Sequence, residues 1–134
     1  MPTSVLVAPI IPAINDAEIE SIIETVANAG AGHASYIFLR LPHEVSQIFR
    51  DWLNVHFPDR AKHVMSLVRQ SAGGQDYDNR FGIRQTGRGP YAQMLGSRFR
   101  AACKRFGICA DRYQQSLDSS RFIRPGSQQL DLNL

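Results

Sequence analysis

This chain of 134 residues has few cysteines and no long apolar run. Cys103 and Cys109 are too few for a disulfide framework, and two ligands alone hold neither a structural zinc nor an iron–sulfur cluster. No stretch approaches the roughly 18 apolar residues that a membrane span needs. The first residues also lack the charged and apolar regions of a secretory signal. These absences predict a cytoplasmic protein that does not cross a membrane.

The motifs of common catalytic sites are missing as well. The four histidines show no H-E-x-x-H spacing, and the chain has no G-x-S-x-G turn for a nucleophilic serine. Residues 82–89 have the glycine spacing of a phosphate loop, but Arg88 and Gly89 replace its lysine and its serine or threonine. Glu44 is better explained as a first-turn helix carboxylate than as an acid–base group. The sequence therefore predicts no metal site and no catalytic residue in this chain.

Charge is distributed unevenly along the chain. Residues 1–68 hold four basic and seven acidic side chains, whereas residues 69–125 hold eleven basic and four acidic ones. The hydrophobic fraction of 43% and the charged fraction of 20% are typical of one folded domain. A basic half suggests a polyanionic partner such as a nucleic acid, and a solvated arginine-rich surface explains the asymmetry equally well.

The N-terminal pattern predicts a strand followed by a helix. Residues 4–11 are almost continuously apolar, which is typical of a strand buried on both faces in a parallel sheet. Asn15 or Asp16 then offers an N-cap, and residues 19–27 place apolar side chains on one helical face. Gly30 is suited to end this helix.

A second strand and three more helices follow. Residues 35–41 are rich in aromatic and branched side chains, as strands are. Pro42 opens the next helix, and the helices after it begin near Asp59 and Pro90. The polar, glycine-rich residues 73–89 separate the last two. The apolar face predicted for the helix after Pro42 consists of Val45, Ile48, Phe49, Trp52, Leu53 and Phe57.

Two parallel strands cannot bury both faces of a sheet by themselves. The predicted fold is therefore α/β, with late βα units of a partial (β/α) barrel in residues 1–72 and a C-terminal helical extension in residues 73–134. Pairing with another copy or another subunit is the alternative. In such folds ligands bind at the carboxyl ends of the strands, which here are residues 8–16 and 40–44.

Residues 73–89 are a candidate surface for nucleic acid. Backbone amides and arginines suit a phosphate backbone, and aromatic rings suit stacking on bases. The candidate phosphate ligands are Arg80, Arg84 and Arg88. The candidate stacking residues are Tyr77, Phe81 and Tyr91. The alternative is a loop that Asp76 and Asp78 order by pairing with those arginines.

Short motifs along nearly the whole chain resemble one enzyme family. Residues 7–19, which read Val-Ala-Pro-Ile-Ile-Pro-Ala-Ile-Asn-Asp-Ala-Glu-Ile, resemble a late barrel strand and its helix in radical S-adenosylmethionine proteins. The similar group is the spore-photolyase-like, or DNA repair photolyase-like, one. Further matching stretches lie at residues 39–45, 51–53, 57–61, 73–74, 77–78, 80–82, 87–91, 120–122 and 124–125.

The resemblance implies the C-terminal portion of an enzyme in which a [4Fe–4S] cluster cleaves S-adenosylmethionine to a radical. The family's C-x-x-x-C-x-x-C cluster loop is not in this chain, so the chain alone is expected to bind neither cofactor and to be inactive. The implied partner is the missing N-terminal barrel segment. The resemblance places Pro9, Pro12 and Asn15 at the wall of the cofactor pocket. It assigns a surface for a repair-like nucleic-acid substrate to Arg80, Arg84, Arg88 and Tyr91.

Two other functions stay open. The first is a stand-alone nucleic-acid-binding module, which predicts binding that weakens steeply with salt. Its basic residues would be Arg80, Arg84, Arg88, Arg98 and Arg121. The second is a non-catalytic assembly domain that buries its strand edges against another subunit.

Overall fold

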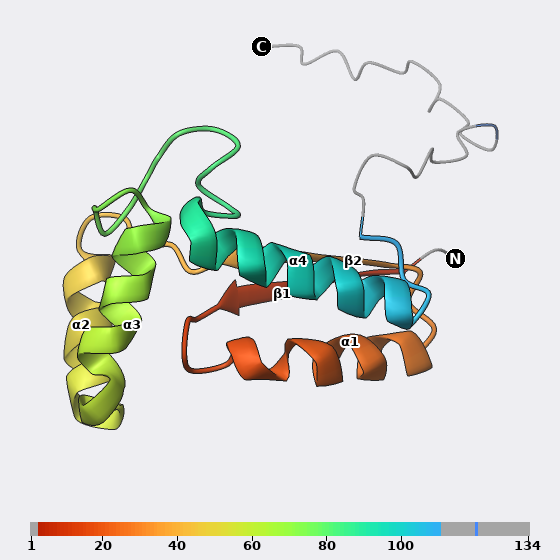
Figure 1. Cartoon of the computed structure of the whole chain (residues 1–134), viewed down its shortest axis with the longest axis horizontal. Helices are drawn as coiled ribbons and strands as arrows, with labels where there is room; N and C mark the ends of the chain where they lie inside the picture. The colour runs from red at the N-terminus through yellow and green to blue at the C-terminus, as the bar shows by residue number, and fades with distance from the viewer. Residues whose placement is uncertain (1–2, 111–119, 121–134) are drawn as a thin grey trace, which may run out of the picture.

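The computed structural model describes residues 3–110 and residue 120, and Figure 1 shows their arrangement. Arg121 and the rest of the motif at residues 121–125 lie outside the described residues. The described elements are the strands β1 (Ser4–Ile10) and β2 (His33–Phe38), a short 3-10 helix η1 (Asp16–Glu18), and the helices α1 (Ile19–Asn28), α2 (Val45–His56), α3 (Pro58–Ser71) and α4 (Gly89–Arg105). The predicted α/β class and the order of the elements are confirmed.

The two strands pair in parallel, with α1 as the crossover between them. The register runs from Ser4 opposite His33 to Val7 opposite Tyr36, and one extra residue of β1 is accommodated before Ile10 meets Phe38. The second strand begins and ends earlier than predicted, since residues 39–41 leave the sheet after Phe38. Gly30 follows α1 with a φ of 86°, a conformation that favours glycine, and it ends the helix as predicted.

One face of this small sheet carries the main core. Helices α1 and α4 lie side by side against it (Figure 1), and Tyr36 of β2 packs its ring 4.8 Å from that of Phe99 in α4. The buried members of this core are Ile10, Ile19, Ile23, Ala34, Phe38, Leu95, Phe99, Ala102, Cys103 and Ile108. The sheet therefore places both of its covering helices on the same side.

The opposite face of the sheet is open. Leu6 on that face is 51% exposed, and its neighbours Ser4 and Ala8 are also exposed. The prediction that the first strand is buried on both faces is therefore wrong for the described chain. The physical reason is that no described helix covers this face of the sheet. The apolar sequence of β1 is nevertheless typical of a strand that is covered on both faces.

The two outer edges of the sheet differ. The outer edge of β2 is capped at both ends, since the Ala34 amide donates to the Cys109 carbonyl at 3.0 Å and the Phe38 amide donates to the Gln85 carbonyl at 2.7 Å. Among the described residues, β1 pairs with no strand other than β2. Within the described residues, the outer edge of β2 is thus occupied at its two ends, whereas the outer edge of β1 has no pairing strand.

Helices α2 and α3 form a hairpin beyond the tip of β1 (Figure 1), and this hairpin has its own smaller core. Helix α3 buries Ala61, Val64, Met65 and Val68, whereas Leu53 is the one fully buried member of the apolar face predicted for α2. Ile48 is 66% exposed and Trp52 is 38% exposed, because α2 packs chiefly against α3. The buried members of the hairpin core are Leu41, Leu53, Ala61, Val64, Met65 and Val68.

The one-sided core predicts a sharp difference between neighbouring positions of α4. Leu95 is fully buried and Met94 is 42% exposed. We expect Leu95→Ala to lower the free energy of unfolding by about 2–5 kcal/mol through lost burial and a residual cavity. The matched control Met94→Ala should change it by less than about 1 kcal/mol. Urea unfolding followed by circular dichroism measures both, and equal losses would contradict this packing.

Candidate functional site

The loop after β1 is held in shape by Asn15. The Oδ1 atom of Asn15 accepts a hydrogen bond from the Ile11 amide at 2.7 Å, and its Nδ2 donates to the Pro9 carbonyl at 3.0 Å. The ring of Pro9 is exposed, whereas Pro12 is fully buried. Of the three residues predicted to form a cofactor wall, Pro9 offers its side chain to solvent and Asn15 fixes the loop. Pro12 packs into the interior.

Tyr91 belongs to this carboxyl end of the sheet and not to the arginine loop. Its hydroxyl donates to Oδ2 of Asp16 at 2.6 Å, and its ring meets Phe38 edge-on at 6.4 Å. Burial raises the pKa of Tyr91, and the hydrogen bond to Asp16 raises that pKa further. Tyr91 therefore joins the start of α4 to η1 as a neutral phenol. Tyr91 was predicted to act with Arg80, Arg84 and Arg88 because it is close to them in the sequence.

The arginines of residues 73–89 divide into two kinds. Arg80 pairs with both carboxylate oxygens of Asp78, and the Nε atom of Arg88 lies 4.0 Å from the same carboxylate. The hydrogen bond from Arg80 is the main reason that the pKa of Asp78 falls to about 2. These contacts of Asp78 agree with the alternative prediction, in which ion pairs within the loop hold it in shape.

Arg84 differs from the other two arginines. Its guanidinium lies 5.3 Å from the ring centre of Phe81, which is 90% exposed. No described carboxylate forms an ion pair with Arg84. The pair of Arg84 and Phe81 is therefore the part of the loop that offers a cation and a stacking ring to a ligand.

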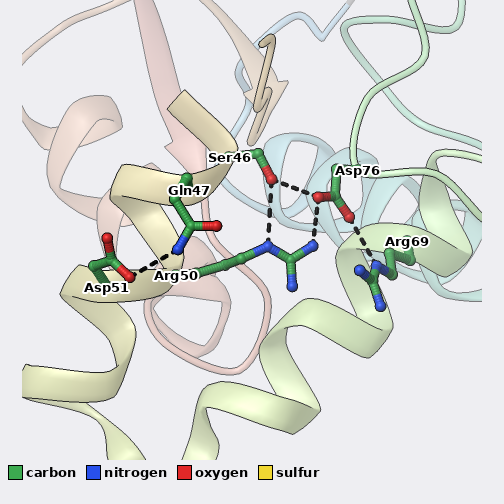
Figure 2. A network of polar contacts seen from close by, with 6 residues as sticks. All are labelled: Ser46, Gln47, Arg50, Asp51, Arg69 and Asp76. Atoms are coloured by element: carbon green, nitrogen blue, oxygen red, sulfur yellow. Dashed lines mark hydrogen bonds and ion pairs between the residues drawn. The ribbon is translucent and has the colours of Figure 1, made fainter. Parts of the chain in front are cut away.

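Asp76 forms the largest polar network in the described structure (Figure 2). It accepts hydrogen bonds from the Ser46 hydroxyl, from Nη2 of Arg50, and from Nε of Arg69 at 2.7 Å. Burial by itself raises the pKa of this carboxyl, but the three donors outweigh burial and hold the pKa well below its ordinary value. The network ties the loop to both helices of the hairpin.

The partners of Asp76 had no signal in the sequence. The alternative in which Asp76 pairs with arginines of its own loop is wrong, since the cations come from α2 and α3. Ser46, Arg50 and Arg69 had no local signal, because their proximity to Asp76 depends on how the hairpin docks. The three of them are functional candidates that only the structure brings together.

Arg40 lies at the carboxyl end of β2. Arg40 donates from Nη2 to the Tyr77 hydroxyl at 2.7 Å, and its guanidinium lies 5.5 Å from the centre of that ring. The buried Nε atom of Arg40 has no partner in the described structure, and neither has the hydroxyl of Ser71. Both residues line the same small cavity of about 20 Å³, which has room for one water molecule.

No group of side chains in the described part of the chain fits an iron–sulfur cluster or another metal ion. Cys103 is buried in the main core, where burial raises the pKa of its thiol, and Cys109 is half-buried. Among residues 3–110 and residue 120, no three metal-ligating side chains come together. None of the described helices is long and apolar enough to cross a membrane.

The Asp76 network predicts a specific dependence of stability on pH. Because folding lowers the pKa of Asp76 below 3.8, the network stabilises the fold above about pH 4 and loses its effect as the pH falls further. We expect Asp76→Asn to cost about 1 kcal/mol of unfolding free energy at pH 6, and the cost to shrink toward pH 2. Asp51→Asn, which removes an exposed carboxylate of α2, is the control. A cost for Asp76→Asn that does not vary with pH, measured by urea unfolding, would contradict the assignment.

Comparison with known proteins adds no relative to this description. No family model, no curated protein and no solved structure matches the chain. Any function must therefore be argued from the described geometry: an α/β unit with one open sheet face, one free strand edge, a loop at the carboxyl end of β1 and a network centred on Asp76.

Proposed function

We propose that this chain forms two late βα units of a partial (β/α) barrel in a radical S-adenosylmethionine enzyme. The observation that carries the proposal is the asymmetry of the sheet: β1 has an unpaired edge, whereas the edge of β2 is capped by residues 85 and 109. A parallel strand with an open edge and an apolar open face is suited to pairing with further strands. Those strands would come from the missing N-terminal barrel segment.

The position of the helices favours a barrel over an open doubly wound sheet. Helices of a doubly wound sheet cover both faces, whereas those of a barrel cover only the outer one. Here α1 and α4 both pack on the face that carries Val7 and Tyr36, and Leu6 is left on the other. In this proposal Leu6 faces the barrel interior.

The loop after β1 has the place that barrel enzymes use for binding. It lies at the carboxyl end of the strand, where active sites of such folds are formed. Asn15 fixes the loop, Pro9 is its accessible ring, and Pro12 anchors it to the interior. This chain would supply a wall of the S-adenosylmethionine pocket, and the cluster would be held by cysteines of the other segment.

The test is reconstitution with the polypeptide encoded immediately upstream of this chain. We expect the joined protein, loaded anaerobically with iron and sulfide, to show cluster absorbance and to cleave S-adenosylmethionine, and this chain alone to do neither. Leu6→Lys should reduce cleavage by about tenfold or more, because a charge would enter the apolar barrel interior. Asn28→Lys, on the exposed side of α1, is the control. An upstream segment without the three-cysteine loop, or a joined protein without a cluster, would overturn the proposal.

A second candidate function is nucleic-acid binding through residues 73–89, with or without the enzyme. The exposed ring of Phe81 beside the cation of Arg84 is the observation that favours it. Arg80 and Arg88 contribute less in this geometry, because both lie at the carboxylate of Asp78.

This candidate predicts salt-dependent binding to single-stranded DNA. Arg84→Gln should lower the slope of log affinity against log salt by about 0.7, since one phosphate contact is lost. Phe81→Ala should weaken binding by about 1–3 kcal/mol through lost base stacking. Arg105→Gln is the matched control, because Arg105 also lies over a neighbouring ring, that of Phe106. Fluorescence anisotropy at several salt concentrations measures all three, and an equal effect of Arg105→Gln would argue against a local site.

A further inference from the structure

A groove between α2 and α3 has a volume of about 490 Å³. Its floor is apolar and consists of Leu53, Ala61 and Met65. Its sides are two polar stripes at helical spacing, one from each helix. The stripe on α2 is Gln47, Arg50 and Asn54, and the stripe on α3 is Lys62, Ser66 and Arg69. The lining therefore contains three cations and no carboxylate.

Two of the cations are held in position by Asp76, which lies outside the lining. Arg50 contributes one amino group to Asp76, and Arg69 contributes its Nε atom. Figure 2 shows the other amino groups of these two arginines pointing away from Asp76. Asp76 thus fixes the two guanidinium groups, and their other N–H groups can still donate to a ligand. Because the two side chains are already fixed, binding an anion costs less conformational entropy.

Lys62 brings the third positive charge without taking part in that network. It is exposed, one turn of α3 before Ser66 and two turns before Arg69. Two carboxylates contact the residues of the stripes: Asp76, which pairs with Arg50 and Arg69, and Asp51, which accepts a hydrogen bond from Gln47 at 2.9 Å. Neither of them lines the groove, so three cations outnumber the one carboxylate that pairs with them.

We propose that this groove binds a nucleotide, with its phosphate on Arg50, Lys62 and Arg69. Guanidinium groups match the oxygens of a phosphate in charge and geometry, and two fixed ones beside a lysine suit a dianion. The base would lie on the apolar floor between the stripes. The volume falls in the range of about 300–1,000 Å³ that is usual for small-ligand sites. This inference uses different residues from the barrel proposal and does not depend on it.

The experiment titrates the 134-residue chain with AMP, adenosine and inorganic phosphate, using calorimetry and the arginine Nε–H signals in NMR spectra. We expect AMP to bind more tightly than either of the other two, since only AMP has both the phosphate and the base. The Nε–H signals of Arg50 and Arg69 should shift on binding. A short single-stranded oligonucleotide tests whether the nucleotide is free or part of a strand, and tighter binding than AMP assigns the groove to a strand.

Lys62→Gln is the decisive variant, because Lys62 makes none of the contacts that hold the hairpin together. It should weaken AMP binding by about fivefold, the loss expected for one exposed charge contact. Lys104→Gln removes a positive charge from the end of α4 and should leave the affinity unchanged. Circular dichroism verifies that both variants fold. The proposal is overturned if the folded chain does not bind AMP, if adenosine binds as well as AMP, or if the two variants weaken binding equally.

Discussion

The structure depends on one constraint: two parallel strands must be joined by a crossover and covered on at least one face. The crossover is α1, and it can bury its apolar stripe only against the face of the sheet that carries Val7 and Tyr36. Helix α4 returns to the same face and completes the core through Leu95 and Phe99. Nothing else among the described residues covers the sheet, so the free edge of β1 and the open face around Leu6 both follow from this arrangement.

Local signals in the sequence were sufficient for the elements and their order. Gly30 ends α1 and Pro90 lies in the first turn of α4, because each residue restricts the backbone in a way that does not depend on the rest of the fold. Periodicity also identified apolar faces correctly. It could not state what covers each face, and Leu6, Ile48 and Trp52 are exposed for that reason. The periodicity of apolar residues shows which side of a helix or strand is apolar. Whether that side is buried depends on the other elements that pack against it.

The contacts of the candidate site also fall into those that the sequence predicts and those that depend on the fold. The pair of Asp78 and Arg80 is only two residues apart, so it could be expected from the sequence. Tyr91 meets Asp16 across 75 residues, and Asp76 meets Ser46 across 30. Those partners are chosen by the docking of helices against the sheet and against each other. Arginines are numerous in this chain, so composition alone gave no reason to prefer Arg50 and Arg69 over the others.

Residues 73–89 were predicted to be either a surface for nucleic acid or a loop ordered by its own ion pairs, and their contacts also tie them to other elements. Asp76 holds one end of the segment to the α2–α3 hairpin, and the Gln85 carbonyl accepts from the Phe38 amide at the edge of β2. The same segment therefore closes the sheet on one side and orients two cations toward the groove on the other. The basic half of the chain is consequently not one continuous surface. Arg80 and Arg88 share the carboxylate of Asp78 within the loop, and Arg84 lies beside an exposed ring. Arg50 and Arg69 share Asp76 between two helices, where Lys62 adds a third positive charge.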